Sequence, residues 1–350
     1  MFSSFGTSGG MGKLKRSLQG ILRKSEFYLT IIFVIMVVLL SCVKSSFGTL
    51  ENAFNILRSS TFIGICSIGV LVVLICAGTD ISFTATATVA QYAMALMIIG
   101  RPGVPIVFVI LLPVLIGMAL GCFNALLLNW LKVPAIIICI AMLNAYYGAI
   151  QVASNGEWLY GFPEWFVRFP NILLIRFTNT SGVEYGLSTL IVVWFAVALI
   201  TSVILKFTKT GRNIYALGGN AIAATREGIN VNRTRIFAFG YLGAIAGIGA
   251  IAQAMITQTS APNALVGQEF DAVAAVVLGG ASIIGGGGTV YGTILGVIFI
   301  AALKNGLTVL GVPSYWHQVF IGFALVISIC VTATREKLAK QNAGGVTIED

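Results

Sequence analysis

The stretch from Lys206 to Arg235 reads KFTKTGRNIYALGGNAIAATREGINVNRTR, and it separates two long apolar segments. It carries one anion, Glu227, whereas the flanking segments Thr189–Leu205 and Ile236–Ile256 carry no charge. Its cations are Lys206, Lys209, Arg212, Arg226, Arg233 and Arg235. Basic loops between membrane-spanning helices stay on the cytoplasmic side. The sequence therefore predicts a cytoplasmic loop over 207–234 between two spanning helices.

The middle of this loop, Ala216–Ile229, is patterned. Gly218-Gly219-Asn220 indicates a turn and a helix cap, and the following AIAATREGI predicts a short helix that ends at Gly228. A short capped helix on a cytoplasmic loop suits docking to a soluble partner. The alternative is a solvated linker that only satisfies the topology.

The composition is that of a membrane protein. Of the 350 residues 57% are hydrophobic and only 9% are charged, and the mean hydropathy is +0.96. Soluble domains carry about a quarter charged residues, so no part of the chain is polar enough for a soluble catalytic domain. The net charge of +9 indicates cytoplasmic loops facing anionic lipid rather than nucleic-acid binding. The six cysteines lack C-x-x-C spacing and are interpreted as small core residues.

About twenty apolar residues are needed for one membrane span, and the sequence predicts about ten transmembrane helices in an all-α polytopic membrane protein. The expected helices are 27–44, 62–78, 84–100, 104–130, 135–153, 187–206, 235–257, 270–282, 290–309 and 314–333. The segment 270–282 is too short to cross alone and is expected to be half-buried or re-entrant. The membrane domain is then 27–333, with cytoplasmic tails at 1–26 and 334–350.

The distribution of positive charge supports this topology. With the N-terminus inside, 15 of the 21 Lys and Arg residues are cytoplasmic: five in the first tail, Lys132, six in the central loop and three in the last tail. Both termini then lie in the cytoplasm. The largest outer loop, 154–186, is rich in aromatic residues, which are either membrane anchors or a landing surface for an external partner.

Polar side chains within the membrane are functional candidates because lipid makes them costly. Asp80, in ICAGTDISF, either caps the following helix or lines a solute pathway. Asp271 opens the short segment 270–282, where an acid complements the helix dipole. The amides on otherwise apolar helices either line an aqueous path for a polyhydroxylated solute or bridge helices. The candidate pathway residues are Asp80, Asn124, Asn144, Gln253, Asp271 and Asn305.

The run GGGGTVYG from Gly285 contains no P-loop, because no Lys-Ser/Thr pair follows the glycines, and the sequence contains no G-x-x-x-x-G-K-[ST]. We therefore expect no ATPase site and no cofactor in this chain. The glycines are interpreted as points where helices pack closely.

Four stretches resemble the permease subunits of bacterial ABC importers for ribose-type sugars and autoinducer-2. They are AGTDISF (77–83), LKVPAIIICIAMLNAYYGAIQVASNG (131–156), GRNIYALGGNAIAATREGINV (211–231), and the block from EFDAVAAVVLGG to GVPSYWHQVFIG (269–322). Ala77 stands where the family has glycine, and Phe-Thr-Ala-Thr follows where Val-Gly-Ser is usual. Both departures lie close to Asp80 and bear on the identity of the solute.

The resemblance implies a multi-pass protein of the bacterial cytoplasmic (inner) membrane that works with three partners. A separate ATPase subunit, holding ATP and Mg, would receive the short helix of the central loop. A periplasmic or lipid-anchored solute-binding protein would dock on 154–186 and 258–268. A second permease copy or paralogue would complete a dimer, in contact with membrane lipid. The implied ATPase-coupling residues are Gly218, Gly219, Asn220, Ala223, Ala224, Arg226, Glu227 and Gly228.

Two other classes of protein compete with this interpretation. An ion-coupled secondary transporter needs titratable groups in the membrane, and only Asp80 and Asp271 are available. An integral membrane enzyme usually needs clustered histidines, acids or metal ligands, whereas this chain has one histidine and scattered acids.

Overall fold

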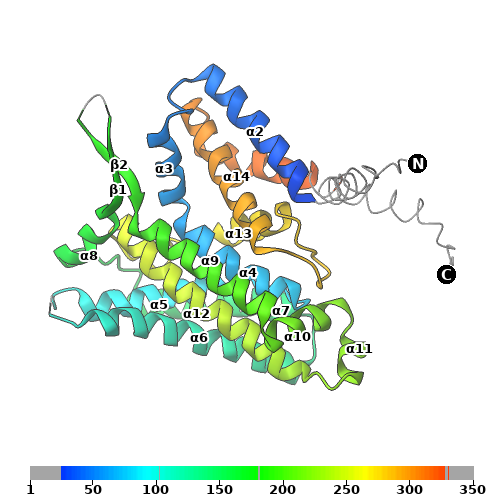
Figure 1. The fold of residues 1–350 in the computed structure, drawn as a ribbon. Helices are drawn as coiled ribbons and strands as arrows, with labels where there is room; N and C mark the ends of the chain where they lie inside the picture. The colour runs from blue at the N-terminus through cyan, green and yellow to red at the C-terminus, as the bar shows by residue number, and fades with distance from the viewer. Residues whose placement is uncertain (1–24, 102, 180–181, 328–329, 331–350) are drawn as a thin grey trace, which may run out of the picture.

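The computed structural model describes residues 25–101, 103–179, 182–327 and 330, and these residues form a bundle of long helices (Figure 1). The expected tails lie outside the described residues, except for Ser25 and Glu26, which begin the first helix.

Six described helices are long and apolar enough to cross a membrane. They are α2 (Ser25–Val43), α6 (Ile106–Leu131), α7 (Ala135–Ser154), α9 (Thr189–Phe207), α12 (Val231–Thr257) and α14 (Val290–Val309). The pair α3 (Leu50–Ser59) and α4 (Thr61–Ile75), bent by 55° at its break, raises the number to seven if it is one span. The prediction of a polytopic helical membrane protein is confirmed at this level. The count of ten crossings and the cytoplasmic termini stay predictions.

The remaining expected segments contain shorter helices. These are α5 (Phe83–Ile98), α13 (Gln268–Leu278) and the apolar helix Ser314–Ile327, which begins with the 3-10 turn η2 (Ser314–Trp316). The helix α13 has 11 residues, about 16 Å at 1.5 Å per residue, which is half of a membrane thickness. The expectation that 270–282 is too short to cross alone therefore agrees with the structure.

Three regions contain elements that were not expected. The helix α3 precedes α4. The segment 154–186 folds into α8 (Glu164–Arg168), η1 (Phe169–Asn171) and a two-stranded antiparallel hairpin of β1 (Leu173–Thr178) and β2 (Glu184–Ser188). The central loop holds a second helix, α10 (Lys209–Gly219), before α11 (Ala221–Arg226). The hairpin is the one β-sheet in the described part of this mainly helical fold, and it lies at the opposite end of the bundle from α11 (Figure 1).

The hairpin is held by packing against α3. Phe54 of α3 stacks on Phe177 of β1 at 6.1 Å between ring centroids, and Phe177 stacks on Tyr185 of β2 at 5.7 Å. Arg58 donates to Asn171 Oδ1 at 2.7 Å. These contacts join a loop and a helix that are far apart in the sequence. Local sequence patterns therefore predicted neither α3 nor the hairpin.

Glycines on α6 and α12 bring these helices into backbone contact. A Cβ on Gly117 would lie 2.1 Å from Gly243 O, and one on Gly121 would lie 2.3 Å from Phe239 O. A Cβ on Gly247 would lie 2.3 Å from Pro113 O. Small residues four apart allow such an approach, which gives membrane helices dispersion contacts that apolar burial alone does not supply. The helix α4, buried over nearly its whole length, packs against the other side of α12.

We expect Gly243→Val to prevent stable folding. Its side chain would meet the backbone of α6, which cannot move aside like a flexible side chain, and overpacking of this kind costs about 1–3 kcal/mol or more. Thermal unfolding and the monodisperse yield in detergent measure the effect. Gly148→Val on α7 is the matched control, because nothing lies within 4 Å of a Cβ there. Equal loss for both variants would contradict a close α6–α12 contact.

Candidate functional site

The central loop folds into two short capped helices, which we call the hook (residues 208–230). The Thr208 side chain accepts a hydrogen bond from Gly211 N at 3.1 Å and begins α10. Asn220 Oδ1 accepts one from Ala223 N at 3.0 Å and begins α11. Gly228, with φ of +78°, follows the end of α11. The predicted Asn220 cap and the helix ended by Gly228 are confirmed.

Gly218 and Gly219 are in the last turn of α10, so the expectation of a turn at both is wrong. Gly218 is required by a close approach instead. A Cβ there would lie 1.7 Å from Ile75 O at the end of α4 and 2.5 Å from Gly286 N. The glycine therefore allows the hook to contact the membrane helices directly.

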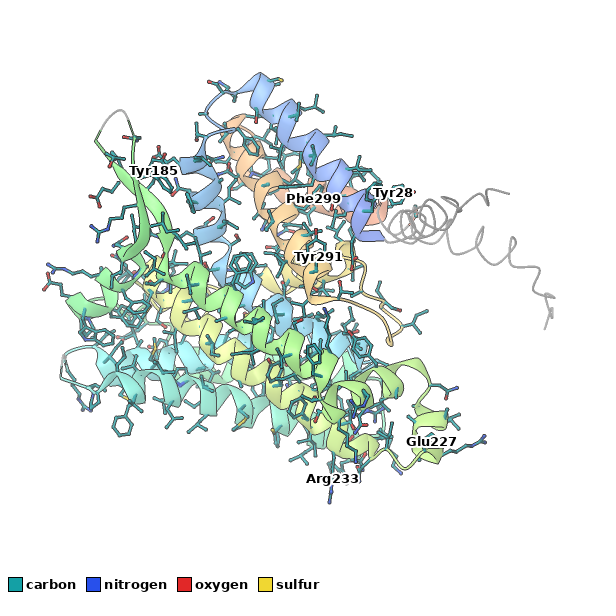
Figure 2. All side chains as sticks on the ribbon, in the orientation of Figure 1. Tyr28, Tyr185, Glu227, Arg233, Tyr291 and Phe299 are labelled. Carbon is teal, nitrogen blue, oxygen red and sulfur yellow. The ribbon has the colours of Figure 1, made fainter. Side chains whose placement is uncertain are left out.

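Most of α11 faces away from the rest of the chain. Ala223, Arg226 and Glu227 are exposed, whereas Ala224 is buried against the protein. Ile222 is 70% exposed, and a large apolar side chain on a short exposed helix is a candidate contact for another protein. Ile222 was not among the predicted coupling residues, because a single isoleucine in an alanine-rich segment forms no periodic pattern. Figure 2 shows Glu227 and Arg233 at the end of the molecule opposite Tyr185.

The loop between α13 and α14, residues 279–289, fastens the hook to the bundle. We call it the glycine loop. Gly286 N donates to Ile75 O at 2.9 Å, and Tyr215 of α10 donates its hydroxyl to Gly288 O at 2.8 Å. Burial raises the pKa of the Tyr215 hydroxyl above its ordinary value. The interpretation of these glycines as points of close packing is confirmed.

Ala77 lies next to the glycine loop and has a left-handed backbone with φ of +58°. This conformation costs a residue with a Cβ about 1–2 kcal/mol. Its Cβ is also the atom nearest to a Cβ built on Gly285, at 2.7 Å. The departure from glycine at position 77 thus places local strain at the junction of α4, the hook and the glycine loop.

Asp80 and Asn124 meet in a buried chain of hydrogen bonds. Asp80 Oδ1 accepts from Ser82 N at 2.7 Å and from Ser82 Oγ at 2.6 Å. Ser82 Oγ accepts from Asn124 Nδ2 at 2.8 Å, and Asn124 Oδ1 accepts from the Tyr146 hydroxyl at 2.8 Å. The chain joins the start of α5 to α6 and α7. Asp80 thus binds Ser82, the N-cap residue of α5, which has no side-chain cap bond. Asn124 bridges the start of α5 to α7, and the pathway role of both residues stays a prediction.

Asp271 and Asn305 meet in a second polar group, at a cavity of about 550 Å³ that we call the Lys304 cavity. Lys304 Nζ of α14 pairs with Asp271 Oδ2 of α13 at 2.5 Å, and Asp271 is only 3% exposed. Asp271 Oδ1 is buried without a hydrogen-bond partner among the described residues. Asn305 lines the cavity and accepts from Asn52 Nδ2 at 2.9 Å, and Gln318 lines it as well.

Lys304 was not predicted as the partner of Asp271. The position of Asp271 in the first turn of a helix had been explained by the helix dipole alone. Lys304 is the one charged residue of α14, and a single cation in an apolar helix is a signal of a buried partner. Glu269, in the same first turn of α13, accepts from Thr84 Oγ1 at 3.0 Å and from Gly267 N. Both acids of α13 therefore bind other elements.

The other two candidate pathway residues lie apart from these groups. Asn144 is exposed on α7, and its Nδ2 donates to Ile140 O of the same helix at 2.8 Å. Gln253 is half-buried on α12 and does not line the Lys304 cavity. The structure thus brings four of the six candidates together in two pairs and leaves Asn144 and Gln253 apart.

A family model described as the branched-chain amino acid transport system / permease component matches residues 52–329. The chain belongs to this permease family. The ribose import permease protein RbsC of Haemophilus influenzae is 34% identical over 312 residues, covering 87% of this chain and 91% of that protein. RbsC of Escherichia coli K12 is 30% identical over 302 residues, covering 86% and 91%. The autoinducer 2 import system permease protein LsrC of Photorhabdus laumondii is 31% identical over 288 residues, covering 82% and 83%.

No solved structure matches this chain. The family match contains both the hook and the Lys304 cavity, and it confirms the resemblance seen in the four sequence stretches. The chain is a permease component and a multi-pass protein of the cytoplasmic (inner) membrane.

We expect Lys304→Met to destabilise the protein by about 2 kcal/mol. Removing one partner of a buried ion pair costs about 3–5 kcal/mol, and we take a lower value because a third of the Lys304 side chain is exposed. The double variant Asp271→Asn/Lys304→Met leaves no unpaired charge and is expected to recover most of the loss. Thermal unfolding midpoints measure the stability of both variants. A double variant that is no more stable than Lys304→Met would contradict a stabilising interaction between the two charges.

Proposed function

We propose that this chain is the membrane-spanning permease subunit of an ABC importer that moves a small polar solute, a monosaccharide or a sugar-like molecule, into the cell. The observation that carries the proposal is the match to the permease family over residues 52–329, together with relatives whose names specify import of ribose and of autoinducer 2.

The polar lining of the Lys304 cavity supports a hydroxyl-rich solute. Ammonium, carboxylate and amide groups from Lys304, Asp271, Asn305 and Gln318 converge there, and such groups donate to and accept from sugar hydroxyls. The family description names branched-chain amino acids, whose apolar side chains would gain little from this lining.

The energy for transport would come from ATP and Mg on a separate ATPase subunit, since this chain contains no P-loop. In this proposal α11 is the coupling helix that seats in the ATPase, with Ile222 and Ala223 at the contact and Gly218, Gly219, Asn220, Ala224 and Gly228 shaping the hook. Arg226 and Glu227 are exposed and would pair with charges of the ATPase. The chain itself would carry out no catalysis.

The hook is in direct contact with the membrane helices, so its movement can be transmitted to them. Gly218 contacts the end of α4, and Tyr215 and Gly286 join the hook to the glycine loop between α13 and α14. A displacement of the hook by ATP-driven closure of the partner would therefore move α4 and the α13–α14 pair together. Rigid movement of packed helices around a polar site is the usual basis of alternating access.

The opposite end of the chain offers a surface for the solute-binding protein. Residues 154–186 and 258–268 are joined there by a bridge, in which Leu159 N donates to Ser260 O at 2.9 Å and Ser260 N to Leu159 O at 3.0 Å. A solute-binding protein resting on this surface would deliver solute near the Lys304 cavity, which Val266, Gly267 and Gln268 help to line. A second copy or paralogue would complete the permease, surrounded by membrane lipid and without a nucleic-acid partner.

The competing function is an ion-coupled secondary transporter. It would need Asp80 or Asp271 to exchange an ion during transport. Asp80 Oδ1 accepts two hydrogen bonds from Ser82, and Asp271 is paired with Lys304. These contacts support structural roles for both acids and therefore favour the ABC permease.

The decisive experiment is uptake into proteoliposomes. We expect the chain to take up ribose or autoinducer 2 only when the ATPase, ATP-Mg and the binding protein are present, and not in response to a proton or sodium gradient. Uptake driven by a gradient without the ATPase would overturn the proposal. The assay separates the two functions because an ABC permease has no energy source of its own.

We expect Ile222→Asp to abolish ATP-dependent uptake and co-purification with the ATPase while the permease stays folded. Ile222 is exposed, so the change leaves the packing of the chain intact but places a desolvated charge in the contact. Val183→Asp in the hairpin, also more than half exposed, is the matched control for co-purification with the ATPase, because the hairpin lies at the opposite end of the bundle from α11 (Figure 1). Normal ATPase binding by Ile222→Asp would contradict the docking role of α11.

A further inference from the structure

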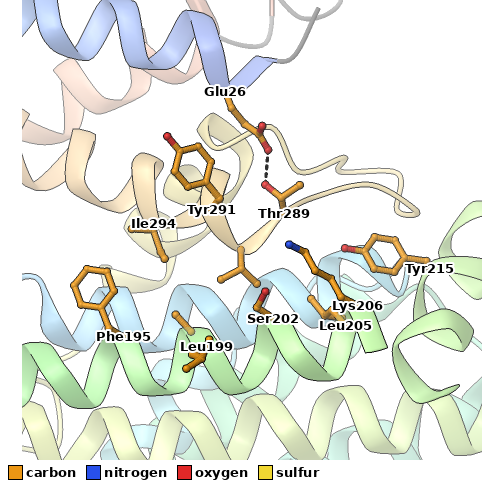
Figure 3. A pocket seen from close by; sticks show the side chains of 12 residues that line it. Glu26, Phe195, Leu199, Ser202, Leu205, Lys206, Tyr215, Thr289, Tyr291 and Ile294 are labelled. Carbon is orange, nitrogen blue, oxygen red and sulfur yellow. Dashed lines mark hydrogen bonds between the residues drawn. The ribbon is translucent and has the colours of Figure 1, made fainter. Parts of the chain in front are cut away.

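A second cavity, of about 700 Å³, lies between α2, α9 and α14 at the end of α9 that leads into the hook (Figure 3). We call it the Lys206 cavity. One wall is apolar, formed by Phe195 and Leu199 of α9 and Ile294 of α14. The other end is polar, formed by Lys206, Glu26 and Thr289. This cavity is separate from the Lys304 cavity, with which it shares no lining residue.

The polar end carries two opposite charges that are not paired with each other. Lys206, in the last turn of α9, has no ion pair within the described ranges. Glu26, in the first turn of α2, accepts a hydrogen bond from the Thr289 hydroxyl but likewise has no ion pair there. Figure 3 shows the Lys206 ammonium and the Glu26 carboxylate on opposite sides of the cavity, with Thr289 between them.

All three helices around the cavity are candidate membrane spans. Phe195 and Leu199 are 41% and 67% exposed, so this side of α9 is not covered by the chain itself. In a bilayer the apolar wall lies at the depth of the acyl chains, and Lys206 and Glu26 lie at a helix end, where headgroups are found. The polarity of the cavity therefore follows that of one phospholipid molecule.

We propose that the Lys206 cavity binds a phospholipid whose headgroup holds both a phosphate and a primary ammonium. Lys206 binds the phosphate, Glu26 binds the ammonium, and an acyl chain lies along Phe195, Leu199 and Ile294. Basic pockets between membrane helices at the headgroup level bind lipid phosphates. A volume of about 700 Å³ holds a headgroup and the first part of a chain.

The charge pair distinguishes this lipid from others. A headgroup with net negative charge and no ammonium would leave Glu26 unpaired beside a phosphate. A quaternary ammonium satisfies the charge of Glu26 but cannot donate a hydrogen bond to it. A primary ammonium supplies both the charge and the donors. The proposal requires only that α2, α9 and α14 span the membrane, and it does not depend on the role of the hook.

Native mass spectrometry of the purified chain tests the proposal, with phosphatidylethanolamine, phosphatidylcholine and phosphatidylglycerol titrated separately. We expect the highest retention for phosphatidylethanolamine. Lys206→Ala is expected to lower it about fivefold, the effect of one cation close to a lipid phosphate. Lys209→Ala is the matched control, because Lys209 is exposed three residues further on and does not line the cavity.

Glu26→Gln tests the ammonium contact. We expect it to remove the preference for phosphatidylethanolamine over phosphatidylcholine while phosphatidylglycerol binds more tightly than before. Ser202→Phe keeps both charges but fills the cavity, and we expect it to lower retention of all three lipids. Thermal unfolding confirms that each variant is folded.

Three outcomes would overturn the proposal: equal retention of the three lipids by the unaltered chain, an equal effect of Lys209→Ala, or no effect of Ser202→Phe. Disulfide crosslinking of the variant Leu199→Cys to a second copy of the chain in native membranes would also overturn it, since the cavity would then be a subunit contact.

Discussion

Backbone contact between helices is the constraint on which the rest of this structure depends. Apolar side chains gain little by leaving lipid for the protein interior, so the helices must be held by close packing and hydrogen bonds. The α6–α12 contact at Gly117, Gly121 and Gly243 supplies this in the centre of the bundle. The same device recurs between α13 and α14, where a Cβ on Gly296 would lie 1.9 Å from Ala275 O. It recurs once more where Gly218 meets Ile75 and Gly286.

The sequence could predict the features that depend on one helix alone, but not those that depend on how the helices pack. Long uncharged segments and the positive charges between them define the spans, because they reflect the energetics of a single helix in lipid. The Asn220 cap and the end of α11 at Gly228 are local as well, and they were predicted. Lys304 and Asp271 are 33 residues apart, and their pairing depends on how α13 and α14 pack. No local pattern contains that information.

The hairpin and Gly218 both depend on tertiary contacts, which local sequence patterns do not predict. The strands β1 and β2 lie in a segment whose aromatic residues also suit a membrane interface, and the stacking of Phe177 on Phe54 of α3 is a tertiary contact. Gly218 was read as a turn residue because glycine often ends helices. Its actual role is to let α10 approach a carbonyl of α4, a neighbour that is far away in the sequence. Of the candidate pathway residues, Asp271 and Asn305 share a cavity while Asn144 and Gln253 do not, and this too depends on helix rotation within the bundle.

The α13–α14 pair connects the two ends of the molecule. Its helices are joined by the glycine loop at the end that touches the hook, and by the Lys304–Asp271 pair toward the other end. Backbone contact at Gly292 and Gly296 keeps the two helices together in between. Glu269 of α13 also binds Thr84, two residues after Ser82, which holds Asp80. Because packed helices move as rigid bodies rather than deform, a displacement at the glycine loop would be carried along α13 to the Lys304 cavity and, through Glu269 and Thr84, to the Asp80 chain. Under the proposed function, one contact at the hook is therefore enough to change both polar regions of the membrane domain.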